Sequence, residues 1–289
     1  MNTQHTIEFK NGKFVALDNS GREIAASASK YYLKQKLAAL PAAIAAPAAS
    51  KFSINDRFTF VDNLVKMVAN KTTPSAVITG EGGLGKSFTV INALKAAGLK
   101  DVSEVDPGTV VASSRMFRVV KGFSTAKGLY RVLHENKNSI IVFDDCDSVL
   151  KDPDALNLLK GALDSFDKRL ITWNTSVSGD GLPRVFEFTG GVIFISNLPQ
   201  EKIDQALKTR SMNVDLSMST EQKIERMQHI VNSGAFLPDV PATVKNQAVA
   251  LIKKHAADAR EISLRTLIKT SKILATGNAQ LATYMLTEA

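Results

Sequence analysis

The sequence predicts an α/β fold in which helices cover both faces of a parallel sheet, with a small β-rich unit before it and a helical part after it. Three observations predict this fold. Apolar strand-like runs alternate with helical patterns between about residues 53 and 200, and such alternation gives parallel sheets. Short β-type runs separated by turn residues come before this region. After Leu216 only helical periodicity remains.

Residues 1–40 are expected to form a β-meander followed by a short helix. The β-type runs at 6–10, 13–17 and 23–26 are separated by Asn11-Gly12 and Asn19-Ser20-Gly21, and these residue types permit the positive φ of hairpin turns. A helical run at 30–40 leads into residues 41–52. That segment is rich in alanine and proline and lacks the bulk to build a core, so we expect a linker.

Residues 53–215 are expected to form the α/β domain and residues 216–289 a small helical domain. Ser53 can cap the first helix of the α/β domain, which carries apolar residues at helical spacing. In the second domain we expect helices at 221–232, 242–255, 262–275 and 279–286.

Composition indicates an ordinary globular chain. No apolar run approaches the roughly 20 residues of a membrane span, and the start lacks a secretion signal, so we expect a cytoplasmic protein without membrane contact. Cys146 is the single cysteine, which makes an intrachain disulfide impossible and a zinc site unexpected. The net charge of +8 is divided as +3, +2 and +3 among residues 1–50, 51–200 and 201–289. This even spread favours solubility over a dedicated nucleic-acid surface.

A glycine-rich motif lies between the apolar run 76–79 and a helical run at 88–94. Strand, glycine loop and helix together direct backbone N–H groups and a helix N-terminus at phosphates. Lys86 would reach the β- and γ-phosphates of ATP, and Ser87 would ligate Mg²⁺. The alternative is a glycine-rich turn that binds no nucleotide. The motif matches G-x-x-x-x-G-K-[ST] with Gly80-Glu81-Gly82-Gly83-Leu84-Gly85-Lys86-Ser87.

Two carboxylates follow the apolar run 139–143. One can hold a Mg²⁺ ion and the next can orient the attacking water, so we assign Asp144 to the metal and Asp145 to the water. The alternative is that one of them caps the helix after Pro153, a role that could equally fall to Asp147, Asp152 or Asp154.

At this point the chain resembles the AAA+ ATPase family, from about residue 54 to about residue 280. The segment before Asn197 also resembles that of phage-encoded ATPases, which would place the protein in the host cytoplasm. Five segments carry the family resemblance in the family's order: 80–87 (Walker A), 140–145 (Walker B), 192–197 (sensor 1), 206–211 (arginine finger) and 263–267 (sensor 2).

The resemblance implies roles for three further residues. Asn197 would help to position water near the γ-phosphate, Arg210 would enter the neighbouring subunit's site, and Arg265 would lie near the γ-phosphate from a helical lid. The plainer alternatives are that Asn197 is a strand-end turn residue, that Arg210 forms a surface salt bridge and that Arg265 is an exposed lid arginine. One departure concerns Asp145, because most members carry glutamate there and the shorter side chain implies slower hydrolysis or a deeper water.

An arginine that acts on another subunit requires a homo-oligomeric ring, which in this family is usually a hexamer with a central channel. Lys121-Gly122-Phe123 occupies the position of the family's first pore loop, where an aromatic residue often grips substrate. The alternative is a plain turn with Phe123 in the core.

A β-hairpin is expected over residues 169–188, because alternating runs flank a loop that contains Gly179-Asp180-Gly181. It resembles the extra hairpin of helicase-related members, which often contacts nucleic acid. Aromatic and basic residues such as Trp173, Arg169 and Arg184 could stack on bases and bind phosphates. The alternative is an inert edge hairpin whose Trp173 packs on the sheet.

Two function classes therefore compete for this chain. In the first, a Mg²⁺-dependent ATPase ring moves or remodels a substrate associated with DNA, through the hairpin. In the second, the ring unfolds or disassembles a protein client that is recruited through residues 1–40. The hairpin and the basic charge favour the first class by a small margin.

Overall fold

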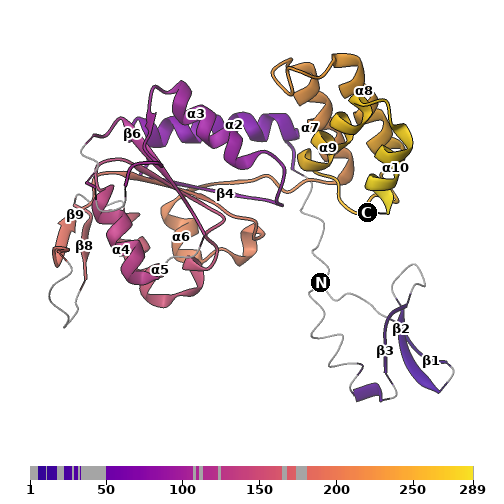
Figure 1. The fold of residues 1–289 in the computed structure, drawn as a ribbon. Helices are drawn as coiled ribbons and strands as arrows, with labels where there is room; N and C mark the ends of the chain where they lie inside the picture. The colour runs from indigo at the N-terminus through magenta and orange to yellow at the C-terminus, as the bar shows by residue number, and fades with distance from the viewer. Residues whose placement is uncertain are drawn as a thin grey trace. The chain divides into compact units, whose positions relative to one another are not determined.

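The computed structural model describes residues 6–10, 12–17, 23–27, 29–31, 33, 50–106, 109–110, 113–122, 125–164, 168–173 and 181–288. The chain divides into two compact units, residues 1–50 and 51–289. Figure 1 shows the ribbon of both units, coloured along the chain.

The first unit contains an antiparallel meander of β1 (Thr6–Lys10), β2 (Lys13–Leu17) and β3 (Glu23–Ser27), in that order. The predicted β-rich unit is thus confirmed. Phe9 and Phe14 face each other across β1 and β2 with ring centroids 4.8 Å apart. Of the predicted turns, Asn11 and residues 18–22 lie outside the described residues. So do most of the predicted helix at 30–40 and of the linker at 41–52.

Six strands form the sheet of the second unit, in the order β11-β4-β10-β7-β6-β5, and every neighbouring pair is parallel. The three central strands are buried along their whole length, as expected where helices cover both faces. In chain order the strands are β4 (Ser75–Thr79), β5 (Lys100–Asp101), β6 (Met116–Lys121), β7 (Ile140–Asp144), β10 (Gly191–Ile195) and β11 (Met212–Asp215).

Helices lie on both faces of this sheet (Figure 1). On one face are α2 (Ile54–Ala69) and α3 (Lys86–Ala96), and on the other are α4 (Ala126–Glu135), α5 (Pro153–Ala162) and α6 (Gln205–Arg210). Because side chains alternate along a strand, Ile140 and Val142 of β7 join the core under α2 and α3, whereas Ile141 and Phe143 join the opposite core. The structure confirms the predicted three-layer αβα fold, which is the architecture that the AAA+ resemblance implies.

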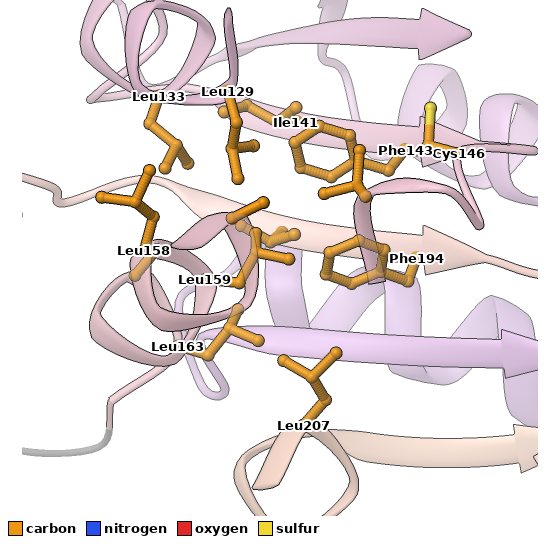
Figure 2. Close-up of a cluster of buried hydrophobic side chains, with 14 of the residues drawn as sticks. Leu129, Leu133, Ile141, Phe143, Cys146, Leu158, Leu159, Leu163, Phe194 and Leu207 are labelled. Carbon is orange, nitrogen blue, oxygen red and sulfur yellow. The ribbon is translucent and has the colours of Figure 1, made fainter. Parts of the chain in front are cut away.

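Figure 2 shows the core between the sheet and helices α4, α5 and α6. The rings of Phe143 and Phe194 stack there at a centroid distance of 5.0 Å, which joins β7 to its neighbour β10. Leucines of the three helices belong to the same core, namely Leu129, Leu133, Leu158, Leu159 and Leu207.

Two helix starts test predicted caps. Ser53 caps α2 in a capping box with Asp56, as its position predicts. Asp152 caps α5, where its carboxylate accepts the N–H groups of Asp154 and Ala155. The acids that follow β7 are therefore not needed as helix caps.

Two short 3-10 helices precede α5 and α6, η1 (Val149–Lys151) and η2 (Gln200–Lys202). The strands β8 (Leu170–Thr172) and β9 (Val185–Glu187) pair in an antiparallel manner as a separate two-stranded sheet, as the hairpin prediction requires. The predicted tip residues 174–180 lie outside the described residues.

After β11 the described chain is helical, with α7 (Thr220–Asn232), α8 (Ala242–Lys254), α9 (Leu264–Ala275) and α10 (Ala279–Thr287). Their ends differ from the predicted ones by at most two residues. These helices share their own core, which includes Met227, Val249, Ile252 and Leu267. Across the part of the chain that the structure describes, no helix is both long and apolar enough to cross a bilayer.

Candidate functional site

The glycine-rich loop joins β4 to α3 at the carboxyl edge of the sheet. Gly80, Gly83 and Gly85 have φ values of 135°, 74° and 91°, a region that glycine enters at little cost. Gly85 is also the N-cap of α3 and brings no side chain to the first turn of that helix. The N–H groups of this turn are therefore left free of a side-chain cap, which is the arrangement that receives a phosphate.

Lys86 lies almost fully buried beneath this loop. Its Nζ donates hydrogen bonds to the carbonyl oxygens of Gly80 at 2.6 Å and Glu81 at 2.7 Å, and to Oδ1 of Asn197 at 2.9 Å. Burial lowers the pKa of Lys86, while nearby carboxylates, Asp145 first among them, act in the opposite direction. The ammonium group is thus held at the base of the loop by oxygen atoms from two strand ends.

Asp144 ends β7 and is buried beside the start of α3. Oγ of Ser87 donates a hydrogen bond to Oδ1 of Asp144 at 2.6 Å. A hydroxyl and a carboxylate oxygen at this separation fit a Mg²⁺ ion, which prefers oxygen ligands. Nζ of Lys121 lies 3.3 Å from Oδ2 of the same carboxylate. No local sequence pattern assigns Lys121 to this contact, although Lys121 ends β6, the strand next to β7, and shares a register position with Asp144.

Asp145 follows β7 in the left-handed backbone region, with φ of 57°. Its Oδ1 accepts a hydrogen bond from Nδ2 of Asn197 at 2.6 Å, so Asn197 joins Asp145 to Lys86. Asp147 instead accepts a hydrogen bond from Oγ of Ser196 at 2.6 Å. The structure thus brings together the predicted residues of the loop, of the strand end at Asp144 and of the strand end before Asn197.

Arg210 is separated from these residues by the length of the sheet. It ends α6 just before β11, at the amino edge of the sheet, whereas the loop follows the carboxyl end of the paired strand β4. Five strand residues span about 16 Å. Nη1 of Arg210 donates to the carbonyl oxygen of Ala206 at 3.3 Å, Nε is buried without a hydrogen-bond partner, and among the described residues Arg210 forms no ion pair.

Arg265 is exposed in the first turn of α9. It follows Leu264, whose N–H donates to the carbonyl oxygen of Gly83 at 2.8 Å. The backbone at Arg265 therefore lies beside the glycine-rich loop, as the sensor 2 resemblance implies. Its exposure also agrees with the plainer alternative of a surface arginine.

The hairpin places two of its three candidate nucleic-acid residues on its inner side. Arg169 donates hydrogen bonds to the carbonyl oxygens of Ala162 at 2.9 Å and Gly190 at 2.7 Å. Trp173 packs on Tyr130 of α4, with ring centroids 5.7 Å apart. Only Arg184 of the three is exposed. The candidate pore residue Phe123 lies outside the described residues, whereas Lys121 and Gly122 lie within them.

Comparison with known protein families found no family model that matches the chain. The chain is 29% identical over 244 residues to an uncharacterized 36.7 kDa protein in the nrdC-mobD intergenic region of Enterobacteria phage T4. This match covers 78% of the chain and 71% of the phage T4 protein.

Two solved structures give similarities at low sequence identity. The chain matches C. elegans PCH-2 with a TM-score of 0.42 and 14% identity, over 78% of the chain and 63% of PCH-2, so it spans less than two thirds of that protein. It matches the FIGL-1 AAA domain in complex with ADP with a TM-score of 0.40 and 14% identity, over 87% of the chain and 82% of that domain.

Proposed function

We propose that this chain is an AAA+ ATPase that binds ATP and Mg²⁺ at residues 80–87 and hydrolyses the nucleotide. One observation carries the proposal. The carboxyl ends of β4, β7 and β10 bring a buried lysine, a hydroxyl–carboxylate pair and an amide–carboxylate pair to one edge of the sheet. Ligands of α/β sheets bind at such edges.

Each group has a chemical task in this proposal. The N–H groups of the loop and the ammonium of Lys86 bind the phosphates. Ser87 and Asp144 hold Mg²⁺, which when bound neutralises charge that develops on the phosphate oxygens. Asp145 accepts a proton or orients the attacking water, and Asn197 fixes its carboxylate through the 2.6 Å hydrogen bond. Arg265 contributes charge from the lid.

We propose that the active form is a homo-oligomeric ring, with six subunits as the expected number. Arg210 supports this, because the length of the sheet separates it from the glycine-rich loop of its own chain. A cation there can complete only the site of a neighbour. The similarity to a phage T4 protein supports a phage origin and hence action in the host cytoplasm.

A nucleic-acid-associated substrate remains our first candidate for what the ring acts on. Arg184 supports it as the exposed cation of the hairpin. Fewer hairpin residues are available to contact nucleic acid than the sequence implied, because Arg169 and Trp173 are occupied by contacts within the protein.

A protein client is the second candidate, and the separate compact unit of residues 1–50 favours it. Phe9 is 62% exposed on the outer strand β1 of the meander, where an apolar client could bind. Comparing single-stranded DNA with an unfolded polypeptide as stimulators of ATP turnover distinguishes the two candidates, since each predicts stimulation by one of them.

The catalytic assignment is tested by two variants. Lys86→Ala removes the phosphate-binding charge and is expected to abolish binding of a fluorescent ATP analogue. Asp145→Asn keeps that charge and is expected to bind the analogue normally, while turnover falls at least 100-fold, the size typical of a lost general base. Normal turnover in Asp145→Asn would transfer the role to another acid, and Asp147, the next acid after Asp145 in the sequence, would be tested first.

A further inference from the structure

Lys223 occupies a position that is unfavourable for a cation. It lies in the first turn of α7, where the helix dipole favours negative charge, and its side chain is only 15% exposed. Its Nζ forms an ion pair with the carboxylate of Glu81, which belongs to the glycine-rich loop. Among the described residues, Glu81 is the acidic residue with which Lys223 forms an ion pair. The pair compensates for both the dipole and the desolvation of the ammonium group.

Glu81 is held at two points as a result. Its carbonyl oxygen accepts the hydrogen bond from Lys86 inside the loop, and its carboxylate extends to Lys223 in the helical domain. The loop pattern accepts any residue at this position, so phosphate binding does not explain the glutamate. The contact with Lys223 does.

A second helix of the same domain also packs on the loop. The N–H of Leu264 donates to the carbonyl oxygen of Gly83 at 2.8 Å. A Cβ atom added to Gly83 would lie 3.1 Å from Cβ of Ser263, and one added to Gly85 would lie 3.1 Å from Cδ1 of Leu264. The starts of α7 and α9 thus contact the loop at three of its residues.

We propose that Lys223 is a positioning residue for the phosphate-binding loop. Through Glu81, Lys223 holds the loop in its observed conformation. It thereby couples the orientation of the helical domain relative to the loop to nucleotide binding. The nucleotide part of this inference rests on the proposed ATPase function, whereas the positioning of the loop does not.

The test is a double-mutant cycle of Lys223→Gln, Glu81→Gln and the combined variant. Hydrogen exchange of the amides of residues 80–85 is measured without nucleotide. Each single variant is expected to exchange about fivefold faster, which corresponds to about 1 kcal/mol for a partly buried ion pair. The combined variant is expected to exchange no faster than either single one, because both remove the same contact. Dissociation of a fluorescent ATP analogue should accelerate in parallel.

Lys254→Gln is the matched control, since it removes the same charge from an exposed position of the helical domain. It should leave loop exchange unchanged. Equal acceleration in this control, or additive effects in the combined variant, would overturn the proposal. If the unaltered protein binds no ATP analogue, the ATPase function fails, and the exchange cycle still decides whether the ion pair positions the loop.

Discussion

At the scale of single residues, the site contains an aspartate in a backbone region that disfavours side chains. Asp145 has φ of 57°, which costs roughly 1 kcal/mol for a residue with a Cβ atom. Its N–H donates to the carbonyl oxygen of Ile195 at 3.3 Å, and its carboxylate accepts from Asn197. Aspartate tolerates this region better than most residues. The turn therefore directs a short carboxylate at Asn197.

Gly80 allows a prediction about the loop itself. A Cβ atom there would lie 2.9 Å from the carbonyl carbon of Leu216, and φ is 135°. Gly80→Ala is expected to lower the free energy of unfolding by about 1–3 kcal/mol, measured by urea denaturation without nucleotide. Gly82→Ala is the control, because its nearest contact would be an ordinary 3.6 Å to Oδ1 of Asn197. Equal destabilisation of both variants would contradict the steric argument.

At the scale of elements, the hairpin of β8 and β9 is attached to the α4 and α5 side of the domain. Ile171 and Phe186 form a cross-strand pair whose side chains enter the core, and Phe186 packs on Tyr130 of α4 at a centroid distance of 5.2 Å. The alternate positions Leu170 and Val185 are 56% and 51% exposed. The inner side of the hairpin is therefore structural, and among its described residues those of the outer side are free to meet a substrate.

The two arginines of the hairpin should therefore respond differently to the same change. Arg169→Met removes the hydrogen bonds to the carbonyl oxygens of Ala162 and Gly190, so the free energy of unfolding is expected to fall by about 1–3 kcal/mol. Arg184→Met, at an exposed position, should change stability by less than about 0.5 kcal/mol. Thermal unfolding measures both. If DNA is the substrate, Arg184→Met should also reduce stimulation of turnover by single-stranded DNA.

At the scale of the whole molecule, the second unit places the glycine-rich loop and Arg210 at opposite edges of its sheet. The loop lies at the carboxyl edge, after β4, and Arg210 lies at the amino edge, before β11. Parallel strands impose this separation, because all of their carboxyl ends lie at one edge of the sheet and all of their amino ends lie at the other. Such an arrangement requires neighbouring copies if Arg210 is to reach a phosphate.

Mixed assembly tests this requirement. Arg210→Ala subunits keep the loop, and Lys86→Ala subunits keep the arginine, so each variant alone should be inactive. Mixing them should restore part of the ATP turnover, because some interfaces join an intact loop to an intact arginine. Size-exclusion chromatography establishes that rings form and exchange subunits. A mixture that forms rings and stays inactive would show that Arg210 does not act between subunits.

The sequence by itself determined the fold class and predicted which side chains the carboxyl edge of the sheet brings together. Local chemistry explains this success. Strand periodicity, the cap at Ser53 and the glycine spacing of residues 80–87 each depend on neighbours within a few positions. Asp144 and Asn197 could be placed together because the carboxyl ends of parallel strands meet at one edge.

Only the tertiary structure decided which side chains are used internally and how the helical domain contacts the loop. Strand alternation predicts that a hairpin has two faces, but it does not say which face meets α4, so Trp173 and Arg169 looked available for a substrate. Glu81 and Lys223 are separated by 142 positions, and neither lies in a pattern that anticipates the other. Their ion pair arises because the chain after β11 places the start of α7 beside the loop. That geometry depends on packing between distant segments, which no local spacing encodes.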